Sequence, residues 1–312
     1  MLRKNFSICL SVSVLSASLL LSACQQQDDD HDTDQSVSTQ AHAASQPAQA
    51  EAFDLVARIE NVRVNLPACS GNNCPDFQIQ RLKSNNAMVN QQVDAAMIEI
   101  LQDQLDLTTI NPAASEIFAS EPQATDFDSQ VQQYAQAFLA VDQQLKKMNA
   151  NPQISFHLQA KVLRKQAHWV TIQLNSDSFL GGAHGAATQQ YLTFDLKKQQ
   201  QLHLSDIVLP DRKAALLKRV HQQFADWVVE QKLANNVEEY EEAWPFKLST
   251  NFYLSGQGLI LQYAEYEIGP YVVGMPSFTI PYAQLKGILK PEYLPKTQAT
   301  TSQSASTVQG TH

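Results

Sequence analysis

The chain has 312 residues, of which 44% are hydrophobic and 17% are charged, and its formal net charge is −9. The composition is that of a globular protein. The acidic balance argues against nucleic-acid binding, which depends on Lys and Arg side chains that neutralise phosphates. A protein of this charge would instead attract a basic partner.

The first 23 residues have the pattern of a secretory signal. Arg3 and Lys4 precede an apolar run from about Ile8 to Leu21, and small residues then lead to Cys24. A positive start, a short apolar core and a small-residue cleavage site are typical of such signals. The apolar run is shorter than the roughly 20 residues that a spanning helix requires. The Leu-Ser-Ala-Cys sequence resembles the bacterial lipoprotein signal, which implies that Cys24 is lipidated, with palmitate among its acyl chains.

The residue after Cys24 bears on the membrane that would hold the protein. Gln25 occupies the position where Asp retains Gram-negative lipoproteins at the inner membrane. The sorting pattern therefore favours an outer-membrane lipoprotein that faces the periplasm, with the inner membrane and the cell surface as alternatives. Removal of Arg3 and Lys4 with the signal lowers the formal charge by two, to −11. Residues 24–50 and 296–312 are polar and lack an apolar period, so both are predicted to be disordered.

Two cysteines remain in the mature chain, and they are separated by four turn-forming residues. Cys69-Ser-Gly-Asn-Asn-Cys74 places Gly71 and Asn72 where a turn can form. In an exported protein such a pair is expected to form a disulfide. The spacing is not the Cys-x-x-Cys pattern of redox catalysts, so Cys69 and Cys74 are predicted to be structural.

Residues 51–152 are predicted to form a module of two strands followed by two helices. Alternating apolar residues predict strands at 62–66 and 77–79, and a helical period predicts helices at 89–100 and 127–148. Asp126 is expected to cap the second helix. Residues 112–122, which begin and end with proline, are expected to form a loop between the two helices.

Residues 153–295 are predicted to form a second domain that begins with a hairpin. Strands are expected at 154–162, 170–174, 192–196, 252–254, 259–261 and 278–280, with the first turn near residues 164–166. A helix is expected to start at Asp211 and to bury the face that carries Leu216 and Val228. Hairpins separated by helices predict an α+β fold with a largely antiparallel sheet and packed helices.

Two motifs in this second domain resemble a known family when they occur together. Gly181-Gly182-Ala183-His184-Gly185 lies between two predicted strands, and Tyr266-Glu267-Ile268-Gly269-Pro270-Tyr271-Val272-Val273-Gly274 follows the predicted helix. At this spacing the pair resembles the RsiV-type extracytoplasmic domain, and residues 51–152 resemble the module that usually precedes it. The resemblance covers roughly residues 51–295.

Only part of the known role of RsiV can be expected of this chain. RsiV is an anti-sigma factor whose outer domain binds lysozyme. Its signalling role requires a transmembrane helix and a cytoplasmic segment, neither of which this sequence predicts. The related upstream module also precedes a peptidoglycan deacetylase domain, which this sequence does not contain. The resemblance therefore implies the fold and the possibility of lysozyme binding, and it does not extend to anti-sigma activity.

His184 is the main candidate for a residue that binds a partner or takes part in catalysis. Glycines on both sides allow backbone conformations that other residues avoid, so the loop could present the imidazole to a partner. The ring could instead tie the loop to its neighbour, or act as an acid or base. A single histidine supplies neither the three protein ligands of a catalytic zinc nor a triad. The sequence predicts no metal site and no cofactor.

An acidic and aromatic segment is the second candidate for binding. Glu265, Tyr266, Glu267 and Tyr271, together with Gly181, Gly182, His184 and Gly185, are the candidate binding residues. Aromatic side chains dominate the energetics of many protein interfaces. If the segment were a strand, Tyr263, Glu265 and Glu267 would share one face and Tyr266 and Ile268 the other, and the pattern would then reflect burial alone.

The sequence favours a non-catalytic binding module of the cell envelope. Its ligand would be a protein or a cell-wall component, with lysozyme as one candidate, because a cationic partner suits the acidic chain. One alternative is a structural or chaperone-like envelope factor. Another is a peptidoglycan-modifying enzyme that uses His184. The sequence names no catalytic residue.

Overall fold

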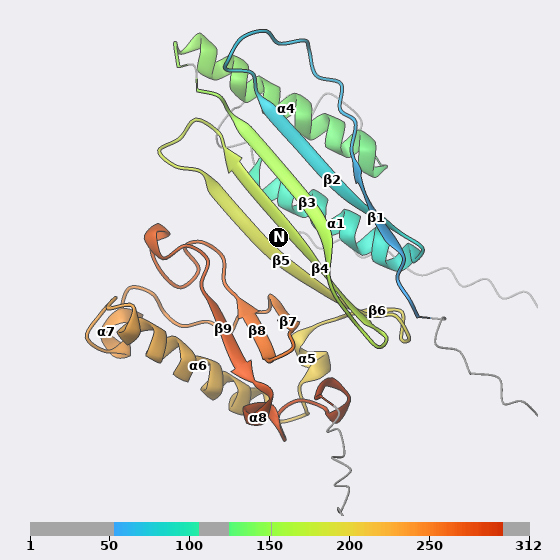
Figure 1. The fold of residues 1–312 in the computed structure, drawn as a ribbon. Helices are drawn as coiled ribbons and strands as arrows, with labels where there is room; N and C mark the ends of the chain where they lie inside the picture. Colours follow the sequence, from blue (N-terminus) through green and yellow to red (C-terminus); the bar gives the residue numbers. More distant parts are fainter. Residues whose placement is uncertain (1–52, 106–124, 151, 296–312) are drawn as a thin grey trace, which may run out of the picture. The chain divides into compact units, whose positions relative to one another are not determined.

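The computed structural model describes residues 53–105, 125–150 and 152–295 (Figure 1). The predicted signal, Cys24, the two predicted disordered ends and the loop at 112–122 lie outside the described residues. The domain boundaries proposed from sequence stay a prediction. Within the described part of the chain, no helix combines the length and the apolar character needed to cross a bilayer.

The first sheet has six strands in the order β1-β2-β3-β4-β5-β6. The strands are β1 (Ala57–Asn61), β2 (Asp76–Ser84), β3 (Ser155–Gln166), β4 (Trp169–Phe179), β5 (Ala186–Asp195) and β6 (Gln200–Leu202). Neighbours pair antiparallel except β2 and β3, which are parallel. A parallel pair needs a long crossover, and the chain between these two strands includes both long helices of the first half. The predicted α+β fold with a largely antiparallel sheet is confirmed.

Helices α1 (Ala87–Gln104) and α4 (Phe127–Lys147) cover one face of this sheet (Figure 1). Their buried faces include Val93, Met97 and Phe138, which join apolar residues of β2–β5 in one core. Asp126 caps α4 as predicted, because its side chain accepts a hydrogen bond from the Ser129 N–H at 2.9 Å. The helical period of the sequence therefore identified both helices and their buried faces.

The second half builds a smaller sheet and a second core. Its elements are α5 (Leu204–Ile207), α6 (Lys213–Glu230), α7 (Val237–Glu241), β7 (Phe252–Leu254), β8 (Gly258–Gln262), η1 (Tyr271–Val273), β9 (Ser277–Pro281), α8 (Tyr282–Leu285) and η2 (Pro291–Tyr293). Strands β7, β8 and β9 form an antiparallel sheet, and α6 packs on β9. Phe224, Phe278 and Tyr263 lie in an aromatic-rich core.

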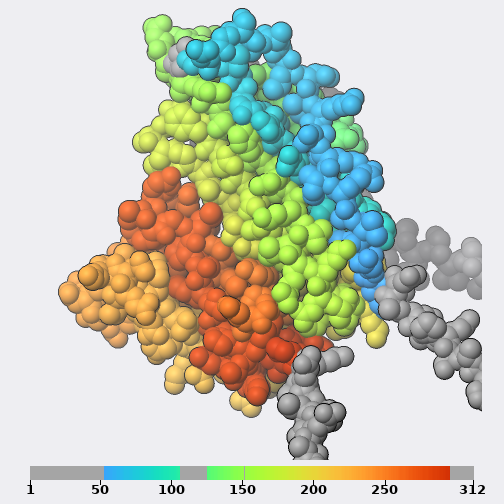
Figure 2. All heavy atoms as spheres, in the orientation of Figure 1, coloured from blue at the N-terminus to red at the C-terminus, as the bar shows by residue number. Residues whose placement is uncertain are grey.

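The two sheets meet where β7 approaches β5. Asn251, just before β7, accepts a hydrogen bond from the Tyr191 N–H at 2.9 Å and donates one to the Gln189 carbonyl at 2.7 Å. The side-chain amide of Asn251 thus bonds one N–H and one carbonyl of β5, as the backbone of a neighbouring strand would. In Figure 2 the orange and red C-terminal elements lie directly against the yellow-green strands. This junction brings the loop after β4 close to the turn after β8.

The strand predicted at 62–66 is wrong, although its burial pattern is present. Val62, Val64 and Leu66 pack against the first core, but β1 ends at Asn61. Asn65 instead pairs with Gln132 of α4, whose side chain accepts from the Asn65 N–H at 2.7 Å and donates to the Asn65 carbonyl at 3.2 Å. The alternating apolar residues therefore mark a segment that is buried on one side but is not a strand of the sheet.

Two other predicted boundaries are also shifted. Helix α6 begins at Lys213 and not at Asp211, which follows Pro210 and takes a left-handed conformation with φ of 61°. The turn predicted at 164–166 lies at Ala167, where φ is 53°, because β3 continues to Gln166 after a bulge between Val162 and Arg164. Both errors occur where a residue other than glycine adopts positive φ.

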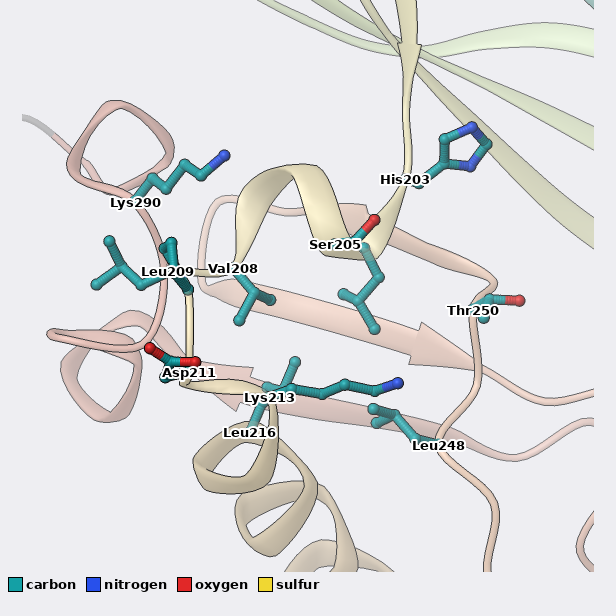
Figure 3. A pocket seen from close by; sticks show the side chains of 12 residues that line it. His203, Ser205, Val208, Leu209, Asp211, Lys213, Leu216, Leu248, Thr250 and Lys290 are labelled. Atoms are coloured by element: carbon teal, nitrogen blue, oxygen red, sulfur yellow. The ribbon is translucent and has the colours of Figure 1, made fainter.

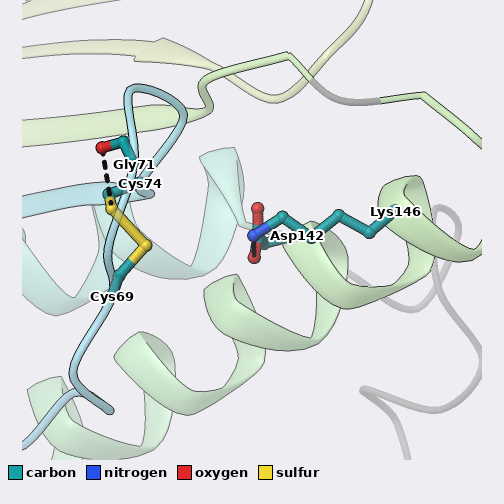
Figure 4. Close-up of a disulfide and its surroundings, with 5 residues drawn as sticks. All are labelled: Cys69, Gly71, Cys74, Asp142 and Lys146. Atoms are coloured by element: carbon teal, nitrogen blue, oxygen red, sulfur yellow. Dashed lines mark hydrogen bonds and ion pairs between the residues drawn. A yellow bond between two sulfur atoms is a disulfide. The ribbon is translucent and has the colours of Figure 1, made fainter.

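The predicted disulfide between Cys69 and Cys74 is present (Figure 4). It closes a loop across a sequence separation of five, in the segment between β1 and β2. Close to it, Lys146 pairs with Asp142 of α4 at 2.7 Å. The bridge closes a surface loop that has few regular backbone pairings of its own.

Candidate functional site

The glycine-rich loop between β4 and β5 holds His184 by close packing. Gly181 has φ of 83°, and a Cβ atom there would lie 2.9 Å from the Leu145 side chain. A Cβ atom on Gly185 would lie 2.8 Å from the Ser178 carbonyl oxygen. By contrast, a Cβ on Gly182 would meet nothing closer than 3.9 Å. The packing around Gly181 and Gly185 therefore leaves no room for a larger residue, whereas a side chain could be accommodated at Gly182.

The His184 side chain contacts its own loop and two tyrosines from the second half of the chain. Its Nδ1 lies 2.8 Å from the Gly185 carbonyl oxygen, which only accepts, so Nδ1 carries a hydrogen. In the neutral ring, Nε2 then accepts from the Tyr266 hydroxyl at 3.2 Å. The imidazole stacks on Tyr271 with ring centroids 4.0 Å apart. These contacts fix both the tautomer and the orientation of the ring.

His184, Tyr266 and Tyr271 form what we call the aromatic cluster. Tyr266 adopts positive φ, 63°, in the turn after β8, and Tyr271 begins η1. The exposed fractions are 50% for Tyr266, 37% for Tyr271 and 86% for the neighbouring Val272. A bulky residue with positive φ is uncommon and costs conformational energy. The cluster thus combines exposure with a backbone that is held in an unfavourable conformation.

The segment after β8 is a turn and not the strand considered from sequence. Tyr263 and Ile268 are both buried, whereas Glu265 and Glu267 are only partly covered. Positive φ at Tyr266 is incompatible with an extended strand, so the residues do not divide between two strand faces. The interpretation of this acidic and aromatic pattern as mere strand burial is therefore wrong.

Two carboxylates border the aromatic cluster without a cationic partner. Glu265 accepts a hydrogen bond from the Ala187 N–H at 3.3 Å, and Glu267 accepts one from the Ala264 N–H at 2.8 Å. Neither makes a salt bridge with any residue in the described ranges. Their negative charge is available to a cationic ligand.

A groove of about 630 Å³ runs beside His184, Glu265 and Tyr266. The end of α1 supplies Asp103 and Gln104 to its wall. The Gln104 amide nitrogen donates to the hydroxyls of Ser176 and Thr188, both at 2.6 Å, while its buried Oε1 has no partner among the described residues. An unsatisfied buried acceptor costs roughly 1–3 kcal/mol.

The structure brings the predicted binding residues into one region. Gly181, Gly182, His184 and Glu265 line the groove with Tyr266, while Gly185, Tyr271 and Glu267 adjoin these residues. Cys24 lies outside the described residues, and the disulfide closes a separate loop. Sequence reasoning missed Gln104 and Val272. Neither carries a local signal, because Gln104 lies at the end of an amphipathic helix and Val272 looks like a core residue.

Both nitrogens of the His184 ring have partners, the Gly185 carbonyl at Nδ1 and the Tyr266 hydroxyl at Nε2. No carboxylate in the described ranges is hydrogen-bonded to the ring. Nowhere in the described part of the chain do three or more His, Cys, Asp or Glu side chains gather as metal ligands.

Comparison with known proteins relates the chain to one family of unknown function. The family model described as "Protein of unknown function (DUF3298)" matches residues 205–283. This range includes Tyr266 and Tyr271 and excludes His184. No curated protein matches the chain. The RsiV-type resemblance is supported only in this coarser form, as similarity to a related domain.

Solved structures of DUF3298 proteins are similar over most of the chain. The crystal structure of a DUF3298 family protein from Pseudomonas aeruginosa PAO1 is 26% identical, with a TM-score of 0.54, over 78% of this chain and 96% of that chain. A DUF3298 member from Bacteroides fragilis NCTC 9343 is 19% identical, with a TM-score of 0.49, over 77% of this chain and 94% of that chain. The first similarity extends well beyond residues 205–283 and supports the α+β assignment.

Proposed function

We propose that the chain is an envelope lipoprotein that binds a cationic protein through the aromatic cluster and the adjoining groove. In this proposal Cys24 is lipidated and anchors the protein in the outer membrane, facing the periplasm. The signal pattern at residues 1–23 supports the anchor. C-type lysozyme is the partner to test first, because it is cationic and because the sequence resembles a lysozyme-binding domain.

The observation that carries the proposal is the way Tyr266 and Tyr271 are presented. Both residues are at least 37% exposed, yet contacts with His184 hold their rings in place. Tyrosine is enriched in the fully desolvated centres of protein interfaces. A ring that is already ordered loses little conformational entropy when a partner covers it. The cluster therefore has the properties of a preorganised interface anchor.

Charge next to the aromatic cluster supports a basic partner. Glu265 and Glu267 lack cationic neighbours within the described ranges, and Asp103 lines the same groove. The chain as a whole has a formal charge of −9. Complementary charge accelerates association, and salt screens its effect. We therefore expect lysozyme binding to weaken as salt is added.

Calorimetric titration of the purified chain with C-type lysozyme tests the proposal. We expect binding at about 20 mM salt that is several-fold weaker at about 300 mM, where the screening length is shorter. Replacing Tyr266 and Tyr271 together by Ala should weaken binding at least about tenfold, as expected for interface anchors. The matched control replaces Leu217 and Val229, which are exposed apolar residues of α6, by Ala.

A second pair of variants tests the electrostatic part. Glu265→Gln with Glu267→Gln keeps the side-chain oxygens that accept backbone hydrogen bonds and removes two charges. Glu238→Gln with Glu242→Gln removes the same charge from exposed positions at α7. Only the first pair should reduce affinity for lysozyme. No detectable binding at low salt, or equal losses in both pairs, would contradict a lysozyme site at the aromatic cluster.

A further inference from the structure

A second hollow lies at the start of α6 and shares no lining residue with the groove. Its volume is about 540 Å³, which is within the range of roughly 300–1,000 Å³ typical of small-molecule sites. Residues from α5, the segment after it, the start of α6 and the segment before β7 line the hollow. It therefore has the size of a ligand site. Its lining comes from three stretches of the chain, 203–216, 248–250 and Lys290.

The inner wall of this hollow is apolar. Leu204, Val208 and Leu216 belong to the second core, and with Leu209 and Leu248 they line the hollow, although Leu216 itself is 0% exposed. In Figure 3 Leu216 and Leu248 lie below Val208, and the Lys213 side chain extends toward Leu248. A wall of branched aliphatic side chains favours a flexible hydrocarbon over a polar ligand, because burial of apolar surface drives binding.

Two lysines border the opening from different segments. Lys213 begins α6, and Lys290 follows α8 from the other side of the hollow (Figure 3). Neither ammonium group makes a salt bridge within the described ranges. Asp211 is the single carboxylate among the lining residues. The two lysines outnumber this carboxylate, so the lining has a positive formal charge in a chain whose formal charge is −9.

The N-terminus of α6 adds to this positive potential. Arg212 is the N-cap residue and forms no capping hydrogen bond with its side chain. The Arg212 side chain has no acceptor atom and so cannot cap the first-turn N–H groups, and the helix dipole favours an anion at this end. The apolar wall, the two unpaired lysines and the uncapped helix end together suit an anionic head attached to an alkyl chain.

We infer that this hollow binds a single-chain amphiphilic carboxylate, of the medium-chain fatty acid class. The alkyl chain would lie against Leu204, Val208 and Leu209, and the carboxylate would pair with one of the two lysines, whose ammonium groups point to different parts of the hollow (Figure 3). This site is separate from the aromatic cluster and does not depend on the proposed function. It gives this chain a place to bind a free fatty acid independently of any protein partner.

Calorimetric titration of the full chain with decanoate tests this inference. We expect saturable binding and an affinity that rises about fourfold for each methylene between hexanoate and decanoate, because each buried methylene strengthens binding by a fixed increment. Decyltrimethylammonium, which has the same chain with a cationic head, should bind at least about tenfold more weakly. Amide chemical shift changes on decanoate addition should centre on residues 204–216.

Charge-matched variants separate the head-group contact from general electrostatics. Lys213→Gln with Lys290→Gln should weaken decanoate binding about tenfold or more, in line with loss of charge-assisted hydrogen bonds. Lys147→Gln with Lys286→Gln removes two exposed lysines that do not line the hollow and should leave the affinity unchanged. The inference is overturned by absent decanoate binding, by equal binding of the cationic amphiphile, or by unchanged affinity in the Lys213 and Lys290 variant.

Discussion

The imidazole of His184 stacks on the phenol ring of Tyr271, with ring centroids 4.0 Å apart and an angle of 23° between the ring planes. This contact joins the loop after β4 to η1, which belongs to the second half of the chain. Aromatic pairs of this kind contribute about 0.5–1.5 kcal/mol beyond simple burial. The same histidine accepts from Tyr266, so one side chain orders both tyrosines of the proposed binding surface.

Tyr266→Asn should separate binding from stability. Tyr266 is 50% exposed and adopts φ of 63°, a conformation that asparagine tolerates better than tyrosine does. We expect the free energy of unfolding to change by less than about 0.5 kcal/mol, as at most exposed positions. Lysozyme affinity should fall because the ring is lost. Urea unfolding and calorimetry measure the two effects, and wild-type affinity in a folded variant would exclude Tyr266 from the interface.

Gly185→Ala should destabilise the loop that holds His184, whereas Gly182→Ala should not. The methyl group introduced at position 185 would lie 2.8 Å from the Ser178 carbonyl oxygen, and the one introduced at position 182 would have no neighbour closer than 3.9 Å. Forced contacts in packed regions typically cost about 1–3 kcal/mol. Urea denaturation of both variants checks this difference. Equal stability of the two variants would show that the loop is not tightly held.

Local patterns in the sequence predicted the helices and most strands because burial repeats along each element. Val93 and Met97 mark α1 by their helical spacing, and both are fully buried. Such patterns could not predict which strands pair with each other. The parallel pairing of β2 with β3 and the approach of Asn251 to β5 join residues that are distant in the chain. The hydrophobic period of a helix or strand shows which of its sides is buried, but it does not show which other element covers that side.

The candidate site was predicted as a set of residues but not as an arrangement. The glycine loop was identifiable because Gly181 and Gly185 meet steric requirements that other residues cannot. The turn at Tyr266 was ambiguous, since its positive φ belongs to a residue that carries no turn signal. Asp211 misled the helix boundary because aspartate is both a common N-cap and a residue that tolerates positive φ in turns. A backbone conformation that tertiary contacts impose cannot be predicted from the residues around it in the sequence.

Asp76→Asn should reduce the dependence of stability on pH in the acid range. Partial burial would raise the pKa of Asp76, but hydrogen bonds from Gln78 and His157 and the charge of His157 outweigh it and lower the pKa below its usual value. The carboxylate therefore stabilises the fold above the unfolded pKa of about 4. This contribution is lost as pH falls through the lower folded value.

The difference in unfolding free energy between wild type and Asp76→Asn should be present above about pH 4 and should shrink as pH falls below that value. Its size should stay under about 1 kcal/mol, because Asp76 and His157 are each 37% exposed at the side chain and solvent screens the pair. Urea titrations across the acid range measure it. Asp177→Asn removes the other carboxylate that contacts His157 and serves as the comparison. A constant difference at all pH values would rule out the linkage.

Replacing Cys69 and Cys74 together by Ser should lower stability without affecting ligand binding. The bridge closes a loop across a sequence separation of five, and in the chain-entropy model closing a loop of this length stabilises by about 2 kcal/mol. Reductant should therefore lower the melting temperature of the wild type and leave that of the variant unchanged. The loop lies outside the groove and the α6 hollow, so lysozyme and decanoate affinities should be preserved. A variant as stable as the oxidised wild type would show that backbone contacts such as the Asn65–Gln132 pair already hold this segment.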